Sequence, residues 1–212
     1  MRWWRTFAGI AEPLDARLRR IAAQRWVVVD CETSGLDPAR DALLAIGGVA
    51  VREARVDVDD SFEVLVRPER PSGRENILIH GIGEGAQRDA VDPVEACRAF
   101  EAWSGGAPRV AFHASFDRAV LDRAARAHLG AASRAEWLDL AALAPALNPG
   151  LRAKALDDWL AHFGIEVEQR HHASADAFAT AMLFLRLLAQ VPPDDRSPGG
   201  LRALARSARW AG

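Results

Sequence analysis

Cysteine is scarce in this sequence: Cys31 and Cys97 are the only two in 212 residues. Cys31 lies in an apolar stretch and Cys97 in a predicted helix, so the pair provides neither a disulfide framework nor the ligands of a zinc cluster. We therefore expect both thiols to be buried and to pack as small apolar side chains.

Long apolar runs are also missing. No run reaches the ~18 residues that a membrane-spanning helix requires. The first residues, 1–5, lead into neither a long apolar core nor a small-residue cleavage pattern. We therefore expect a protein of the reducing cytoplasm that has no membrane partner.

A charge excess of one sign is absent as well. The 27 basic and 29 acidic residues leave a net charge of −2, which excludes a protein that coats nucleic acid by charge alone. This near-neutral net charge is still compatible with an enzyme that binds a few nucleotides at the end of a nucleic-acid chain, because bound metal ions supply local positive charge. Lys154 is the only lysine, and arginine, which makes up the other basic residues, suits phosphate recognition.

Apolar residues, in contrast, are plentiful enough for a sizeable core. Half of the 212 residues are hydrophobic, which predicts one compact domain with extensions at its ends. We place the domain at residues 25–190. Residues 1–24 have the apolar spacing of a helix, which either packs on the domain or meets a partner. Residues 191–212, rich in proline, glycine and arginine, are expected to be a mobile or partner-bound tail.

The most informative stretch is an apolar strand that ends in two acids. Residues 26–29 predict a strand buried on both faces. Asp30 and Glu32 follow it and point to one side, because side chains alternate across a strand, while Cys31 points to the other. Two carboxylates held together in this way favour a hard divalent cation such as Mg²⁺ between them. The alternative is a solvated strand end with incidental acids.

The order of the predicted elements indicates an α/β fold. Strands over 43–51 and 56–66 continue the first strand in an antiparallel start, and Gly47-Gly48 indicate a close approach of another backbone. Two short strands and several helices then alternate. The short strands are expected at 109–113 and 137–140, and the helices at 92–103, from 117 onwards, at 151–163 and at 174–189. We predict a mixed sheet, antiparallel in its first three strands and then parallel, flanked by helices.

Two further acids are predicted at helix starts. Asp117 follows a short strand, so it leaves the same edge of the sheet as Asp30, and Asp176 lies in the first turn of the last helix, where the dipole favours a carboxylate. With Ser174 as the N-cap, His171 falls in the preceding loop, where a neutral imidazole could take a proton from a metal-bound water. Each acid alone also fits an ordinary helix start, and His172 competes with His171.

Together these motifs resemble the DEDDh family of 3′–5′ exonucleases, which has a ribonuclease H-like fold and includes proofreading polymerase subunits, ribonuclease T and oligoribonuclease. The resemblance covers roughly residues 25–190. The three motifs that carry it are Asp30-x-Glu32-Thr33-x-Gly35-Leu36, His113-x-x-Phe116-Asp117 and His171-x-Ala173-x-x-Asp176-Ala177.

The resemblance implies a set of site residues and cofactors. Two Mg²⁺ or Mn²⁺ ions would be held by Asp30, Glu32, Asp117 and Asp176, and His171 would be the general base. The residues implied to contact the terminal nucleotide are Thr33, Gly35, Leu36, His80, Ile82, His113 and Phe116. His80 is equally compatible with an ordinary loop histidine. His113 departs from the family pattern, which usually has asparagine at this position.

The favoured function is therefore the removal of nucleoside 5′-monophosphates from single-stranded 3′ ends, with DNA preferred over RNA. A polymerase or another protein could bind through the termini. Two alternatives stay open: an oligoribonuclease-like enzyme that cleaves short RNA, and a non-catalytic module that binds nucleic acid or a polymerase.

Overall fold

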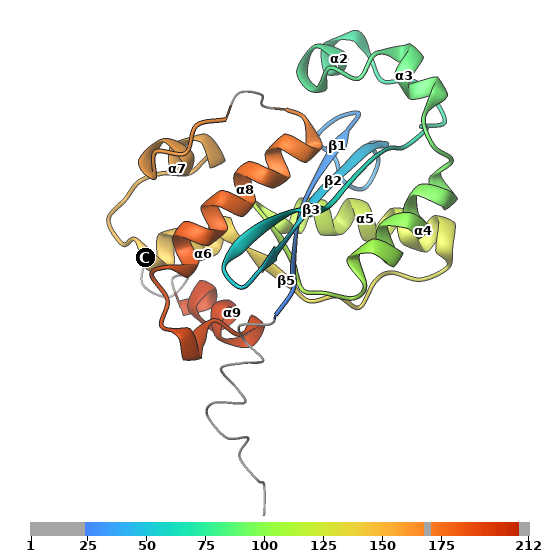
Figure 1. The fold of residues 1–212 in the computed structure, drawn as a ribbon. Coiled ribbons are helices and arrows are strands. Elements are labelled where there is room, and N and C mark those ends of the chain that lie inside the picture. Colours follow the sequence, from blue (N-terminus) through green and yellow to red (C-terminus); the bar gives the residue numbers. More distant parts are fainter. Residues whose placement is uncertain (1–23, 168–170, 208–212) are drawn as a thin grey trace, which may run out of the picture.

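Five strands form one mixed sheet in a computed structural model that describes residues 24–167 and 171–207. The strand order is β3-β2-β1-β4-β5 (Figure 1). β1 pairs antiparallel with β2, which pairs antiparallel with β3, whereas β4 and β5 run parallel to β1. The predicted mixed sheet is therefore confirmed. The strand bounds are β1 Trp26–Thr33, β2 Leu43–Arg52, β3 Arg55–Leu65, β4 Arg109–Ala111 and β5 Trp137–Asp139.

Helices cover both faces of this sheet (Figure 1). α4 and α5 pack against one face, and α8 lies across β1 and β2 on the other, next to α6 and α7. The helix bounds are α2 Arg74–His80, α3 Glu84–Asp89, α4 Pro93–Ser104, α5 Ala114–Leu129, α6 Leu140–Leu147, α7 Leu156–His162, α8 Ala173–Leu188 and α9 Pro198–Ser207, with a short 3₁₀ helix at Pro193–Asp195.

Alternation along β1 assigns its side chains to the two cores. Val28 is fully buried in the cluster that includes α8, whereas Val27 and Val29 are buried in the cluster formed with α4 and α5. Trp26 meets Phe184 of α8 edge to face, with ring centroids 5.2 Å apart. The even-numbered side chains of β1 therefore face α8, and this parity continues to Asp30 and Glu32.

The helix expected at 151–163 is shorter than predicted. It starts only at Leu156, because the Asp158 carboxylate accepts hydrogen bonds from the backbone N–H groups of Lys154 and Ala155, which caps the helix there. The preceding α6 was not predicted. Its apolar sequence reads as the end of a strand, but Asp139 caps it by accepting a hydrogen bond from the Ala141 N–H.

The segment after residue 190 was expected to be a mobile or partner-bound tail, and the expectation of a mobile tail is wrong over the described part of that segment. α9 packs against α6 and β5, with Leu201 fully buried and Ala205 nearly so. Three apolar residues, Leu201, Leu204 and Ala205, form the inward face of this helix, and the surrounding glycines and arginines mask their helical spacing. The predicted helix over 1–24 lies almost wholly outside the described residues, and the domain boundaries stay predictions.

Cys31 and Cys97 are free and buried, as predicted. In the part of the chain that the structure describes, no helix combines the length and apolar character needed to cross a membrane.

Candidate active site

Three carboxylates converge where β1 ends beside α8. Ligand oxygens of Asp30, Glu32 and Asp176 all lie within 4.8 Å of one another. The first two share the α8 side of β1, and Asp176 stands in the first turn of α8, near the positive end of the helix dipole. Clustered oxygen donors of this kind are what a hard divalent cation binds, so the donor set fits the implied metal.

Gly47 allows α8 to reach the sheet at this point. It pairs with Asp30 across β1 and β2. A Cβ atom at residue 47 would lie 2.1 Å from the carbonyl carbon of Ala173 and 2.3 Å from the backbone nitrogen of Ser174. No other residue type fits without moving backbone, so the close approach predicted from the glycine pair is confirmed, and it brings Asp176 beside Asp30.

Asp117 approaches β1 from the opposite side, in the first turn of α5. Its side chain is buried, and its Oδ1 accepts a hydrogen bond from the Cys31 N–H at 3.0 Å. Burial and, to a smaller extent, the charge of Asp139 raise the pKa of Asp117 to about 7, against the hydrogen bonds that lower it. Asp117 therefore contacts β1 at Cys31, the residue between Asp30 and Glu32. It does not belong to the three-carboxylate cluster.

His171 lies in the loop before α8, as expected, and Asp176 of the acid cluster is hydrogen-bonded to the backbone of that loop. The His171 N–H donates to Asp176 Oδ2 at 3.0 Å, and its φ of 60° places it in the left-handed region, which histidine tolerates better than most residues. Its side chain is exposed. Ser174 is not the N-cap: α8 begins at Ala173, so His172 occupies that position, two residues earlier than predicted and without a side-chain cap bond.

His172, the competing histidine, is held at the outer edge of the sheet. Its Nδ1 lies 3.2 Å from the Ser174 hydroxyl and 3.3 Å from a carboxylate oxygen of Glu63 on β3. These contacts engage the ring outside the acid cluster. The geometry therefore favours His171 over His172 as a group that acts at the cluster.

The backbone conformation of His113 is compatible with histidine in place of the asparagine that is usual in the family. His113 is the N-cap of α5 with φ 61° and ψ 47°, and its N–H donates to Asp139 Oδ1 at 3.0 Å. Asparagine and histidine are both enriched in this left-handed conformation, so either residue can start the helix. The exposed His113 side chain is open to a substrate, whereas Phe116 is half-buried against the α4–α5 core.

Three of the implied substrate residues lie at the end of β1 and in the loop after it. The Thr33 hydroxyl donates to the Gly35 carbonyl at 2.6 Å, which tightens the turn. Leu36 at the tip is 92% exposed. The Asn76 amide of α2 donates to the Ser34 carbonyl, so α2 borders this loop.

His80 does not reach the surface, contrary to the expected contact with a nucleotide. It is buried, and its Nδ1 accepts a hydrogen bond from the Ile82 N–H at 3.0 Å. The ring proton therefore sits on Nε2, which lies 3.3 Å from the Ser72 hydroxyl. Gln87 completes this network with bonds to Ser72 and to the Ile82 carbonyl. His80 thus holds the α2–α3 segment together, and Ile82 packs against the start of α8.

Acidification should weaken the fold through His80. Burial lowers the pKa of His80 below its ordinary value of 6.5, so the unfolded chain binds the proton more readily than the folded one. This contribution to stability is complete above pH 6.5 and is lost as the pH falls below it, by at most about 1.4 kcal/mol per pH unit. Urea unfolding at pH 5 and pH 7 would measure it.

His80→Asn is the matched variant for this measurement, because its side-chain oxygen can still accept from the Ile82 N–H but does not titrate. We expect the drop in unfolding free energy between pH 7 and pH 5 to be smaller in His80→Asn than in the wild type. An equal drop in both proteins would contradict the assignment.

Asp139 is the site residue that sequence reasoning missed. One of its carboxylate oxygens accepts from the N–H groups of His113 and Ala141, so it joins the start of α5 to the start of α6. Its position directly before an apolar helical run is an N-cap signal that could have identified it.

Comparison with known proteins places this site in a family. The RNase_T family model, described as exonuclease, matches residues 27–184. The PolC-type DNA polymerase III of Bacillus subtilis is 32% identical over 181 residues, covering 85% of this chain and 12% of that protein. A DNA polymerase III subunit epsilon-like protein of Rhodobacter capsulatus is 34% identical over 166 residues, covering 77% of this chain and 23% of that protein.

Among solved structures, exonuclease X in complex with 5′-overhanging duplex DNA is similar with a TM-score of 0.63 and 26% identity, over 77% of this chain and 91% of that one. The chain thus spans only a small part of these curated relatives, but nearly all of exonuclease X. The similarity confirms the ribonuclease H-like fold and the DEDDh resemblance. Because the family model matches most of the chain, this protein belongs to the RNase_T exonuclease family.

Proposed function

We propose that this protein hydrolyses phosphodiester bonds at single-stranded 3′ ends and releases nucleoside 5′-monophosphates. The observation that carries the proposal is the meeting of Asp30, Glu32 and Asp176 within 4.8 Å. Family membership supports the reaction type, and the DNA polymerase and DNA-complex descriptions of its relatives favour DNA over RNA.

The acids fit a pair of Mg²⁺ or Mn²⁺ ions. Asp30, Glu32 and Asp176 offer clustered oxygens, and Asp117 adds a buried carboxylate from the other side of β1. Such ions supply an activated water and neutralise charge at the attacked phosphorus and the leaving 3′ oxygen. A nearby cation would favour the ionised form of the buried Asp117, whose pKa is raised.

The protein's own groups orient the substrate and move the proton. His171 would accept a proton from the attacking water, and Asp176 fixes the backbone of His171 through its Oδ2. Thr33 at the end of β1, and Gly35 and Leu36 in the loop after it, would meet the terminal nucleotide. The exposed His113 would contact it from the start of α5.

His171→Ala should lower the catalytic rate by about 10²–10³-fold, because it removes the proton acceptor, with little change in the affinity for single-stranded DNA. Single-turnover kinetics and binding measured separately would show this split. His172→Ala is the control, and we expect it to keep a near-normal rate. Equal effects of the two variants would argue against the assignment of the base.

A digestion panel tests the function itself. Purified protein would be incubated with 5′-labelled DNA and RNA oligonucleotides of the same sequence, with Mn²⁺, with Mg²⁺ or with EDTA. We expect stepwise shortening from the 3′ end of DNA that requires a divalent cation. Preferential shortening of RNA would overturn the preference for DNA, and binding without shortening would overturn the enzymatic proposal.

We further propose that the protein acts in the cytoplasm, and that it works together with a polymerase, as the names of the relatives suggest. The partner would reach the chain through its terminal segments. Co-purification of the full chain with a polymerase subunit, lost on deletion of residues 1–23, would support this part of the proposal.

A further inference from the structure

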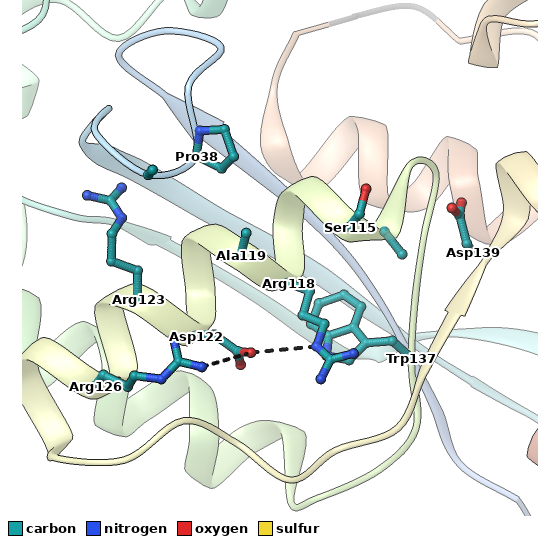
Figure 2. Close-up of a pocket in the computed structure, with 11 residues that line it drawn as sticks. Pro38, Ser115, Arg118, Ala119, Asp122, Arg123, Arg126, Trp137 and Asp139 are labelled. Atoms are coloured by element: carbon teal, nitrogen blue, oxygen red, sulfur yellow. Dashed lines mark ion pairs between the residues drawn. The ribbon is translucent and has the colours of Figure 1, made fainter.

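A groove of about 700 Å³ runs along the outer side of α5 (Figure 2). The proposed catalytic acids do not line it. Its walls come from α5, from the loop that contains Pro38 and from β5. We call it the α5 groove, and the residues that define it are Ser115, Arg118, Asp122, Arg123, Arg126 and Trp137.

The α5 groove carries an excess of positive charge in a chain whose net charge is −2. Arg118 and Arg126 flank Asp122 at i±4, with nitrogens 3.5 and 3.7 Å from its Oδ2 (Figure 2). The single negative charge of Asp122 is thus shared by two guanidinium groups, both of which are well exposed. Arg123 donates to the neutral backbone carbonyl of Asp41, so this bond leaves its charge uncompensated.

One end of the groove adjoins the candidate active site. Ser115 lies two residues before Asp117, and Asp139, which also lines the groove, accepts the hydrogen bond from the His113 N–H. From Ser115 to Arg126 the helix rises about 16 Å at 1.5 Å per residue. At the 3.4 Å spacing of stacked nucleotides, this length corresponds to about five nucleotides.

The groove also holds an aromatic ring. Trp137 of β5 is half-buried and lines the groove beside Arg118 (Figure 2). Exposed arginines along a track with an aromatic side chain are the combination that binds single strands, because the arginines follow the phosphates and the ring stacks on a base.

We propose that the α5 groove binds the single-stranded stretch on the 5′ side of the terminal nucleotide, with its phosphates on Arg118 and Arg126 and a base against Trp137. This inference rests on the proposed function, since that function places the 3′ end at the acid cluster. Binding in the α5 groove would make the affinity for single-stranded DNA depend on the length of the strand. Binding of the terminal nucleotide alone would not produce such a dependence.

The test measures binding in EDTA, so that it does not depend on catalysis. The anisotropy of fluorescein-labelled dT20 and dT3 would be titrated with wild-type protein and with Arg118→Gln/Arg126→Gln. For the double variant we expect the Kd for dT20 to rise about tenfold at low salt, and the slope of log K against log salt to fall by about 1.4, at about 0.7 per lost contact. The Kd for dT3 should be unchanged.

Asp122→Asn provides a change in the opposite direction. It removes the carboxylate that competes with phosphate for both arginines, so binding of dT20 should tighten about threefold. This variant keeps the test decisive if circular dichroism shows that the double arginine variant does not fold. Arg55→Gln/Arg206→Gln is the control with the same charge change, since both residues are exposed and lie outside the α5 groove.

Equal weakening by the control pair, equal weakening for dT3 and dT20, or no change in Asp122→Asn would overturn the groove assignment. The assignment would also be overturned if these substitutions weakened the binding of an acidic peptide but not that of dT20. Failure of the proposed function looks different: the wild type would release no nucleotides with Mn²⁺, whatever the anisotropy shows.

Discussion

Asp30→Asn should reduce nucleotide release by at least about 10³-fold while leaving the fold intact. Asp30 is the strand acid that faces both Glu32 along β1 and Asp176 across to α8. Its replacement by a neutral amide removes charge from the cluster that is proposed to hold the metal, and a loss of about 4 kcal/mol of transition-state stabilisation corresponds to that factor. Timed digestion of a 5′-labelled oligonucleotide with Mn²⁺ would measure it.

Asp59→Asn is the matched control for this experiment. It makes the same charge change on an exposed residue of β3 and should keep full activity. Thermal unfolding of both variants would establish that they fold. Activity within a few-fold of wild type in a folded Asp30→Asn protein would remove the basis of the proposed site.

Gly47→Ala should damage both stability and activity. The added Cβ would lie 2.1 Å from a backbone atom of Ala173, so the start of α8 must move away from β2. Overpacking of this kind costs about 1–3 kcal/mol, which lowers the Tm by roughly 2–4 °C per kcal/mol in a chain of this size. Displacement of Asp176 by about 1 Å should lower the rate by up to about 100-fold.

Gly48→Ala separates the two effects. A Cβ at this position would lie 2.7 Å from the ring edge of Trp103, a side chain on the opposite face of the sheet. It should therefore lower the Tm without a specific loss of rate per folded molecule. If Gly47→Ala and Gly48→Ala lost activity in equal proportion to their stability, the link from Gly47 to the site would be wrong.

The local features of the site could be predicted because they depend on a few neighbouring residues. Strand alternation alone puts Asp30 and Glu32 on one side, and a glycine pair in a strand signals a close backbone approach at Gly47. Helix-start chemistry places Asp117 and Asp176 in first turns. The order of the predicted strands and helices along the chain was then sufficient to predict a mixed sheet, antiparallel at first and then parallel, whereas the order of the strands within it came from the structure.

Other features depend on how distant segments pack. The burial of His80 goes with its contact to Ser72, which is in turn bonded to Gln87, and no spacing rule reveals these contacts. The separation of Asp117 from the three-carboxylate cluster follows from α5 and α8 covering opposite faces of β1. The packing of α9 and the arginine track along α5 likewise appear only once the helices are in place.

The sequence by itself determined which residues are proposed for the chemistry and on which elements most of them stand, because strand and helix periodicities act over a few residues. Only the tertiary structure decided which acids come within reach of one ion, which histidine is exposed and which is buried, and where positive charge gathers. Those properties are set by distances between segments far apart in the chain, and it is the close packing of helices onto the sheet that sets those distances.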